Sequence, residues 1–586
     1  MTLCDYPAHE PECDGDDSPL VEEVLGKLED VPPGKKKMFE VRDRKVLVIN
    51  DDGKLFAING LCSHYNFSLE NGTYAKGRIR CPLHGACFNV RSGDIEDYPG
   101  FDSLHSYSVS VQNGDIVIKT TEKKLGSDRR IRHLPKMKQC NDRPVVVIGG
   151  GVATGTFIEH SRLNGLITPI LVISEESFPP YDRVLLSKNP SATGENIRLR
   201  KDDAFYEERN VKFQLKTSVV SVNPNKREVQ LSNGETVLYS KLIIATGGNV
   251  RKLQVPGADL KNICYVRKVE EANHIADLHP GKHVVCVGSS FIGMEMASSL
   301  AAKAASVTVI SNTPEPLPVF GSDIGKGIRL KFEEKGVRFE LSANVVSLRG
   351  NEQGEVSKVI LQDGKELDVD LLVCGIGVTP ATEFLAGSGI KLDKRGFIEV
   401  DEKFRTNISY VFAIGDTVSA PLPHWDIESI NIQHFQTAQT HGQYLGYTIV
   451  GKPQPGPIVP YFWTLFFFAF GLKFSGCSQG FTKEYTNGDP EAGSFVRYFL
   501  KKDRVIAVAA GGPSQAASQF AEIFKKGIEV TLKDLKNSKD HTWGHLLLHS
   551  SSMIHEISKI SQIMSSVTSI QTTTSDPCNP IHLTCI

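Results

Sequence analysis

Two short stretches near the start of the chain each place a cysteine close to a histidine. The pairs are Cys62-x-His64 and Cys81-x-x-His84. Two thiolates and two imidazoles could form a closed tetrahedral zinc site, or they could hold a [2Fe–2S] cluster with the cysteines on one iron and the histidines on the other. Zinc fingers usually group cysteine with cysteine, whereas each stretch here supplies one ligand of each kind. The order of the ligands therefore favours the two-iron cluster.

A glycine-rich turn follows a run of apolar residues at positions 145–148. The turn contains Gly149, Gly151 and Thr154, and a helical stretch comes after it. In this arrangement the backbone N–H groups of the helix N-terminus point outward and can bind a pyrophosphate. The next predicted strand ends near Glu175, whose carboxylate is our candidate ligand for a ribose diol. Thr154 replaces the third glycine or alanine of the usual pattern, so we expect slightly looser helix packing.

A second turn of the same kind lies in the middle of the chain and contains Gly288, Ser290 and Gly293. The hydroxymethyl group of Ser290 either crowds a pyrophosphate or donates a hydrogen bond to it. The strand that follows ends in Ser311-Asn312, where a NAD site usually has an acidic residue and an NADP site has an arginine nearby. We favour NADH as the ligand, and the alternative is a degenerate fold that binds no nucleotide.

The elements that must position these residues change in character along the 586-residue chain. Short apolar runs separated by turn pairs such as Asp52-Gly53 predict β structure first, and alternating strands and helices predict α/β layers later. The predicted divisions are an acidic tail (1–19), a β domain (20–120), a linker (121–140), a first nucleotide-binding domain in two parts (141–270 and 399–455), a second nucleotide-binding domain (271–398), a C-terminal domain (456–530) and a Ser/Thr-rich tail that we expect to be disordered (531–586).

The composition of the chain argues against a nucleic-acid-binding, a secreted or a membrane-spanning protein. The formal net charge of -2 gives no broad basic field, so we expect no nucleic-acid partner. The 12 cysteines are scattered and include no Cys-x-x-Cys pair, which favours a reducing compartment, and the cytoplasm is the expected location. The apolar stretch at 459–476 is too short for a membrane helix, and its aromatic residues predict buried strands instead.

The metal-ligand pattern C-x-H-x16-C-P-L-H-G resembles the Rieske ferredoxin family over about the first 120 residues. High-potential members of that family carry a disulfide between the two ligand loops. Phe67 and Leu83 stand where those cysteines would be, so the domain resembles the lower-potential ferredoxin subtype.

From residue 143 to about 525 the chain resembles the FAD-binding pattern of the pyridine nucleotide–disulfide oxidoreductase superfamily. The motifs that carry the resemblance are the first glycine turn, the segment Tyr181–Lys188, the strand that ends in Thr246-Gly247 and the strand that ends in Gly415-Asp416. The segment at 181–188 contains no cysteine, so a dithiol relay is not expected. The pattern is closer to the branch of apoptosis-inducing factor and the ferredoxin reductases.

This resemblance implies roles for individual residues. Arg183, Lys188 and Asp416 would contact FAD, and Glu295 would form an ion pair with Lys188. His434 and Trp463 lie in segments that border the flavin ring in relatives.

The whole chain resembles the Rieske-containing apoptosis-inducing factor-like family. The implied fold is multidomain: an all-β Rieske [2Fe–2S] domain, an α/β flavoprotein with two dinucleotide-binding domains, and a C-terminal α+β domain that forms dimers in relatives. The implied function is electron transfer from NAD(P)H through FAD to the cluster and on to an unknown acceptor. The alternative is an NADH-responsive redox sensor with little turnover. Some members of the family associate with mitochondria.

Overall fold

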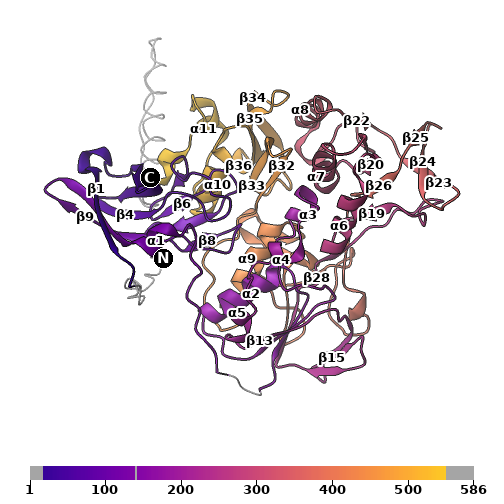
Figure 1. Cartoon of the computed structure of the whole chain (residues 1–586), viewed down its shortest axis with the longest axis horizontal. Helices are drawn as coiled ribbons and strands as arrows, with labels where there is room; N and C mark the ends of the chain where they lie inside the picture. Colours follow the sequence, from indigo (N-terminus) through magenta and orange to yellow (C-terminus); the bar gives the residue numbers. More distant parts are fainter. Residues whose placement is uncertain (1–16, 139–141, 549–586) are drawn as a thin grey trace, which may run out of the picture.

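The computed structural model describes residues 17–138 and 142–548 of the chain. The predicted acidic tail lies mostly outside these residues. The elements are arranged as an N-terminal β domain, two nucleotide-binding domains and a C-terminal domain (Figure 1). The C-terminal domain lies between the N-terminal β domain and the second nucleotide-binding domain, and the first nucleotide-binding domain lies below it in this view.

The N-terminal domain consists of two antiparallel sheets. Consecutive β-branched and aliphatic residues form strand β3, which is buried along most of its length. Asp52 and Gly53 both have positive φ and close the tight turn between β3 and β4. In spatial order, the first sheet contains β1 (Leu20–Lys27), β10 (Asp115–Thr121), β9 (Ser106–Gln112), β4 (Lys54–Asn59), β3 (Arg44–Asp51) and β2 (Lys36–Val41), and the second contains β5 (Thr73–Tyr74), β6 (Arg78–Arg80), β7 (Cys87–Asn89) and β8 (Ile95–Asp97).

The first nucleotide-binding domain is built on a five-stranded parallel sheet. Its central strand β11 (Val145–Ile148) is fully buried and leads directly into helix α2 (Val152–Leu163). Helix α9 (Phe435–Thr448) packs against α2, although it comes from the second segment of this domain. The other strands of the sheet are β13 (Val211–Gln214), β12 (Ile170–Ile173), β17 (Lys241–Ile244) and β29 (Val411–Ala413).

The second nucleotide-binding domain repeats this layout. Its central strand β20 (His283–Val287) leads into helix α7 (Phe291–Leu300). The remaining strands are β19 (Ile263–Tyr265), β26 (Leu371–Cys374), β21 (Ser306–Ile310) and β22 (Val337–Glu340), and the flanking helices are α6 (Val269–Leu278) and α8 (Ser322–Glu333).

Smaller elements complete the two nucleotide-binding domains. The short helices are α1 (Glu122–Gly126) in the linker, α3 (Leu185–Lys188), α4 (Gly194–Ile197) and α5 (Ala204–Glu207). The small sheets are β14 (Val219–Asn223) with β15 (Glu228–Leu231) and β16 (Thr236–Leu238), β18 (Gly248–Val250) with β27 (Val378–Pro380), β23 (Val345–Gly350) with β24 (Val356–Leu361) and β25 (Glu366–Asp368), and β28 (Ile398–Glu399) with β30 (Val418–Leu422) and β31 (Ile427–Ile430).

The C-terminal domain is an antiparallel sheet covered by a helix. The apolar stretch at 459–476 forms its first two strands, which confirms the prediction of buried strands over a membrane helix. Within the described part of the chain, no helix is both long and apolar enough to cross a membrane. The strands are β32 (Tyr461–Phe466), β33 (Phe470–Gly476), β36 (Arg504–Gly511), β35 (Ser494–Lys501) and β34 (Lys483–Asp489), and helix α10 spans Ala516–Lys525.

Ordered structure continues past the predicted boundary at residue 530, which corrects the expectation that the whole segment 531–586 is disordered. Helix α11 (Leu532–Asn537) begins with a capping box in which Thr531 and Asp534 bond each other's backbone N–H. Leu535 and Trp543 are buried in the core of the C-terminal domain. These apolar side chains stabilise residues 531–548 by packing, whereas residues 549–586 lie outside the described part of the chain.

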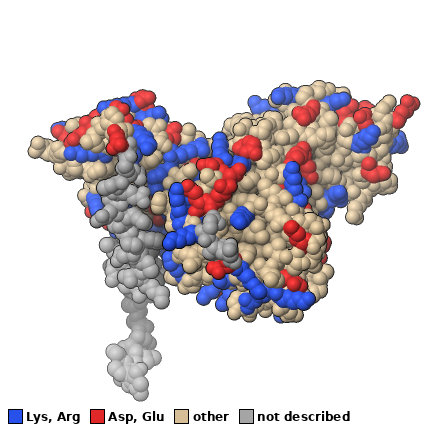
Figure 2. Space-filling view, turned by 60° about the horizontal axis from the view of Figure 1, so that its bottom comes forward, with Lys and Arg blue, Asp and Glu red and all other residues tan. Residues whose placement is uncertain are grey.

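Charged side chains of both signs share the surface. Figure 2 shows Lys and Arg interspersed with Asp and Glu, so neither sign covers this face. Exposed pairs such as Lys326–Glu491, at 2.9 Å, are typical of the surface. Each pair of this kind stabilises the fold by at most about 1 kcal/mol.

Candidate functional site

The four predicted metal ligands come together in two loops of the N-terminal domain. Cys62 and Cys81 are both buried, and a hydrogen bond between their thiols raises the pKa of Cys62 and lowers that of Cys81. The Nδ1 atoms of His64 and His84 face each other at 3.2 Å. Among the described residues, no three of these four ligand atoms lie within 4.8 Å of one another. A cysteine pair beside a histidine pair fits two irons better than one zinc ion.

Both histidines are electrically neutral in this environment. Burial lowers the pKa of His64 to about 3 and that of His84 to about 2. The neutral imidazole can ligate a metal through a nitrogen lone pair. The ligand set therefore fits a [2Fe–2S] cluster in both donor type and protonation.

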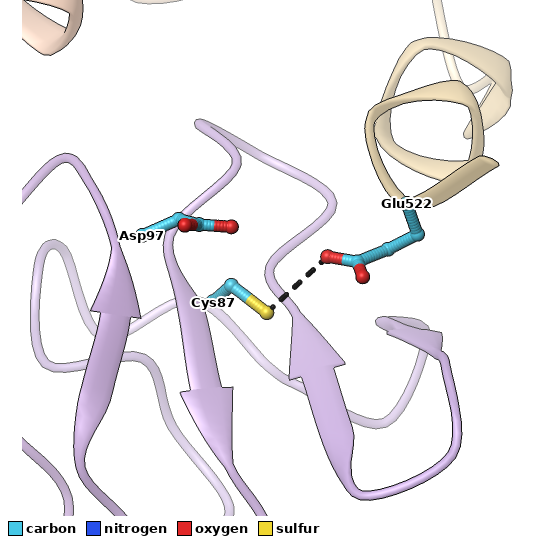
Figure 3. A group of neighbouring side chains, drawn as sticks. All are labelled: Cys87, Asp97 and Glu522. Carbon is cyan, nitrogen blue, oxygen red and sulfur yellow. Dashed lines mark hydrogen bonds between the residues drawn. The ribbon is translucent and has the colours of Figure 1, made fainter. Parts of the chain in front are cut away.

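A second group of possible ligand atoms, Cys87, Asp97 and Glu522, lies nearby (Figure 3). Strands of the N-terminal domain carry the first two, and helix α10 carries Glu522. Three cations already surround the two carboxylates. The pairs are Arg78–Glu522 (3.3 Å), Arg80–Glu522 (2.5 Å), Arg78–Asp97 (2.6 Å), Lys525–Asp97 (2.5 Å) and Arg80–Asp97. This arrangement is an ion-pair network and leaves no carboxylate for a metal ion.

We call these five charged residues, Arg78, Arg80, Asp97, Glu522 and Lys525, the interdomain clasp, because they join the N-terminal and C-terminal domains. The Glu522 side chain is only 1% exposed. Burial alone would raise the pKa of Glu522, but the guanidiniums of Arg78 and Arg80 lower it to about 2. The clasp is therefore ionised at neutral pH, and breaking it would leave buried charges unpaired.

Helix α9 adds a row of glutamines to the same domain contact. Their side-chain amides donate to backbone carbonyls of the N-terminal domain. The contacts are Gln436 to His84 (3.2 Å) and Tyr98 (2.5 Å), Gln439 to Gly100 (3.3 Å) and Gln443 to Glu96 (3.1 Å). One of these carbonyls belongs to the ligand His84, so the first nucleotide-binding domain directly supports a metal-ligand loop.

The first glycine turn has the shape that a pyrophosphate requires. Gly149 has a φ of 103°, and a Cβ atom there would collide with the carbonyl of Ala245. The position of a Cβ atom at Gly151 is open. Thr154 is buried, and its hydroxyl donates to the Gly149 carbonyl at 2.7 Å. The threonine thus ties the helix to the turn, which the sequence pattern did not reveal.

Three charged side chains, those of Asp416, Arg183 and Arg267, lie close together in the same domain. Asp416 is partly buried, and its buried Oδ1 atom has no hydrogen-bond partner among the described residues. Burial raises the pKa of Asp416 despite the neighbouring guanidiniums of Arg267 and Arg183. A buried acceptor without a donor fits the hydroxyl groups of a polyol chain, and the two guanidiniums fit a pyrophosphate. The sequence analysis missed Arg267, which lies in no recognised motif.

Three further residues predicted in this domain, Glu175, Thr246 and Gly247, have clear positions. Glu175, the candidate ribose ligand, is half exposed and forms an ion pair with Lys268 at 2.9 Å. Its neighbour Glu176 instead pairs with Arg183 at 2.6 Å. Thr246 donates to the Ala381 carbonyl at 2.8 Å, and Gly247 adopts a positive φ of 68° beside the Arg267 guanidinium.

The predicted pair of Lys188 and Glu295 is present and buried. Their charged atoms lie 2.5 Å apart, and both side chains are less than a tenth exposed. Ser187 and Thr464 donate to the same carboxylate at 2.6 and 2.8 Å. Ser187 of α3 and Thr464 of β32 thus fix the Glu295 carboxylate, which in turn fixes the ammonium of Lys188.

Trp463 connects this pair to the metal-ligand loops. Its indole ring stacks on the His84 imidazole, with centroids 3.6 Å apart and planes inclined by 24°. The Lys188 ammonium lies 5.0 Å from the centroid of the same indole. His84 is only 4% exposed. One aromatic ring therefore contacts both a cluster ligand and the candidate flavin site.

His434 lies close enough to Lys188 to be affected by its charge. It is the N-cap of α9, where its Nδ1 accepts from the Gln436 backbone N–H at 3.3 Å. Burial, and to a lesser degree the Lys188 ammonium, lower its pKa to about 3. A neutral imidazole at a helix N-terminus leaves the positive end of the helix dipole to act on the site.

The second nucleotide turn differs from the first. Gly288 has a φ of 103°, and Gly293 lies so close to the Gly288 carbonyl that no Cβ atom would fit. Ser290 is the N-cap of α7, and its exposed side chain makes no cap hydrogen bond. Ser311, at the end of β21, bonds the Ser289 hydroxyl at 2.6 Å. This turn can accept a nucleotide but presents no charged side chain of its own.

Comparisons with known proteins agree with both halves of the site. Residues 143–442 match the family described as pyridine nucleotide-disulphide oxidoreductase, and residues 22–108 match the Rieske [2Fe-2S] domain. Apoptosis-inducing factor 3 of Mus musculus is 34% identical over 522 residues, covering 88% of this chain and 86% of that protein. Rubredoxin-NAD(+) reductase of Ectopseudomonas oleovorans is 32% identical over 55% of this chain and 83% of its own length.

A solved structure extends the similarity to the fold. The covalent putidaredoxin reductase–putidaredoxin complex aligns over 72% of this chain and 100% of that chain, with a TM-score of 0.64 and 25% sequence identity. The ferredoxin reductase for the CYP199A2 system from Rhodopseudomonas palustris aligns over 68% of this chain and 99% of that chain, with a TM-score of 0.62 and 25% identity.

Proposed function

Because the chain belongs to the pyridine nucleotide-disulphide oxidoreductase family and carries a Rieske [2Fe–2S] domain, we propose that it passes electrons from NAD(P)H through FAD to its own cluster and on to an external acceptor. The family relation makes the chain an oxidoreductase that uses FAD and a nicotinamide nucleotide. The internal route to the cluster goes beyond that relation.

One observation carries the internal route. Trp463 stacks on the ligand His84 and lies beside Lys188, so a single side chain spans the boundary between the two cofactor sites. The ion pairs of the interdomain clasp and the hydrogen bonds of the α9 glutamines also join the N-terminal domain to the other domains. A domain contact this extensive keeps donor and acceptor at a fixed separation, which is what repeated electron transfer between them requires.

We assign FAD to the first nucleotide-binding domain. Gly151 provides the open approach for the pyrophosphate, Arg183 and Arg267 provide its positive charge, and the unpaired oxygen of Asp416 accepts from the ribityl chain. When bound, FAD accepts a hydride from NAD(P)H and releases electrons one at a time, as a one-electron cluster needs. Lys188, fixed by Glu295, places a positive charge at the ring and favours its reduced form.

The final acceptor needs an exposed approach to the cluster. Trp463 covers His84, whereas His64 borders Tyr65 at a ring-centroid distance of 4.2 Å. Tyr65 is 44% exposed. We propose that electrons leave through this exposed edge. The cytoplasmic location and the homodimer suggested by the sequence also remain proposals.

Anaerobic titration of the purified protein with NADH tests the proposal, with flavin followed optically and the cluster by low-temperature EPR. We expect bleaching of the flavin together with a reduced Rieske signal. A bleached flavin with a silent cluster, and a long-lived reduced complex with negligible turnover, would contradict internal transfer and support the sensor alternative. Zinc in place of iron and sulfide would contradict the cluster itself.

A further inference from the structure

The hairpin of β32 and β33 faces the cluster loops with two residues in direct register. Trp463 and Lys473 are opposite each other across these strands. Trp463 contacts the histidine side of the ligand set, as described above. Lys473 contacts the cysteine side, because its ammonium donates to the carbonyl of Pro82, the residue after the ligand Cys81, at 3.3 Å.

Lys473 is a cation without a carboxylate partner in the described structure. Its second contact, at 2.8 Å, is the Ser514 carbonyl, which carries no net charge. Burial lowers its pKa to about 8, and the negative group that opposes this effect is Cys81. The side chain thus spans the domain boundary and brings an ammonium charge to a ligand loop whose anions are the cluster thiolates.

We propose that Lys473 is a positioning residue that raises the reduction potential of the cluster and thereby makes electron transfer from the flavin more favourable. Two ferric ions, two sulfides and two thiolates sum to zero charge in the oxidised cluster when both imidazoles are neutral. Adding one electron, with no bond made or broken, gives a net charge of -1. A nearby ammonium in a medium of low dielectric constant stabilises the reduced cluster more than the oxidised one.

The domain contact therefore does more than hold the cluster near the flavin. Lys473 belongs to the C-terminal domain, so its charge acts on the cluster only while the Rieske domain is docked. The same interface therefore both docks the Rieske domain and raises the reduction potential of the cluster. The inference rests on the proposed function, specifically on the assignment of the cluster to Cys62, His64, Cys81 and His84.

The test is an EPR-monitored redox titration of the full-length holoprotein in dithionite, comparing the wild type with K473Q. Glutamine keeps donors for the two carbonyls but removes the charge. We expect the ratio of reduced to oxidised cluster at a fixed ambient potential to fall about tenfold, which equals about 59 mV for a one-electron couple. The titration follows only assembled clusters, so incomplete loading of the variant does not affect it.

Two further variants separate charge from structure. K473R keeps the charge, and we expect it to restore the wild-type potential. K501Q removes a lysine from strand β35 of the same sheet, which β36 separates from β33, and serves as a control for net charge, with no expected shift. An unchanged potential in K473Q, or an equal fall in K473R, would overturn the role of Lys473. Absence of any Rieske signal in the wild type would instead refute the proposed cluster.

Discussion

The two places where electrons would change carriers are built in different ways. At the junction of flavin and cluster, groups from three domains meet in a buried contact with ion pairs, glutamine hydrogen bonds and a stacked Trp463–His84 pair. At the second nucleotide turn, Ser290 is exposed, and Ser311 bonds other residues of its own domain. A buried contact suits two domains that stay docked. An exposed turn suits a nucleotide that must leave after each turnover.

The largest expected effect comes from breaking the clasp. In E522Q, the guanidiniums of Arg78 and Arg80 lose a buried carboxylate partner, and we expect the free energy of unfolding to fall by about 3–5 kcal/mol. Denaturant titrations that follow the visible absorption of the cluster measure this change. E491Q removes an exposed carboxylate from the Lys326 pair and should cost less than about 1 kcal/mol. Equal losses in the two variants would contradict the clasp.

The same comparison predicts a dependence on pH. The pKa of Glu522 is lowered on folding to about 2, so its ionisation stabilises the folded chain fully above the ordinary glutamate pKa of about 4.3. This contribution is lost as the pH falls from that value toward about 2. The difference in stability between wild type and E522Q should therefore be constant from pH 7 to about pH 5 and shrink below about pH 4. A difference that already declines near neutral pH would contradict the ionised clasp.

Next in size is the effect of the Lys188 charge at the proposed flavin site. K188M removes the ammonium that Glu295 fixes, and we expect flavin reduction by NADH to slow about a hundredfold, as when a preorganised charge-stabilising group is lost. Stopped-flow absorbance of the flavin under anaerobic conditions measures this rate. K326M, which removes an exposed lysine, is the control. A K188M rate within twofold of this control would mean that Lys188 has only a structural role.

The W463L variant distinguishes reduction of the flavin by NADH from reduction of the cluster by the flavin. We expect reduction of the flavin by NADH to remain close to the wild-type rate, whereas reduction of the cluster slows about tenfold or more because the groups at the junction lose their alignment. F466L alters another aromatic residue of β32, which packs instead against Phe332, and should leave both rates unchanged. Rapid-freeze EPR measures the second step. If both variants behaved alike, the stacked ring would not be part of the route.

The smallest effect should come from the exchangeable site. Because the Ser290 side chain makes no cap hydrogen bond, its hydroxyl is available to the pyrophosphate. We expect S290A to raise the KM for NADH about fivefold, corresponding to the loss of about 1 kcal/mol, with kcat nearly unchanged. Steady-state kinetics with an artificial acceptor provide the measurement. A lower KM in S290A would show that the side chain crowds the nucleotide.

Local sequence patterns, together with the family resemblance, were sufficient to predict the fold class. Strands, glycine turns and ligand pairs depend on neighbours within a few residues. The structure places Cys62 beside Cys81 and His64 beside His84. The ion pair between Lys188 and Glu295 followed from the family resemblance and is present.

Contacts between domains could not be predicted in the same way. The stacking of Trp463 on His84, the clasp through Glu522 and the position of Lys473 depend on how separately folded domains dock, and no periodicity within either segment encodes that. The role of Arg267 was not predicted for a related reason. Its guanidinium lies near Asp416, which is far away in the sequence. The packing of residues 531–548 was hidden by the polar composition around a few buried apolar side chains.

The most direct test of the account is the rate of cluster reduction after rapid anaerobic mixing with NADH, measured at several protein concentrations. Transfer within one chain predicts a first-order rate that does not change over a hundredfold range of dilution, because the docked domain keeps the effective concentration fixed. A rate that falls in proportion to protein concentration would show that electrons pass between separate molecules. That result would contradict the closed junction as the route from flavin to cluster.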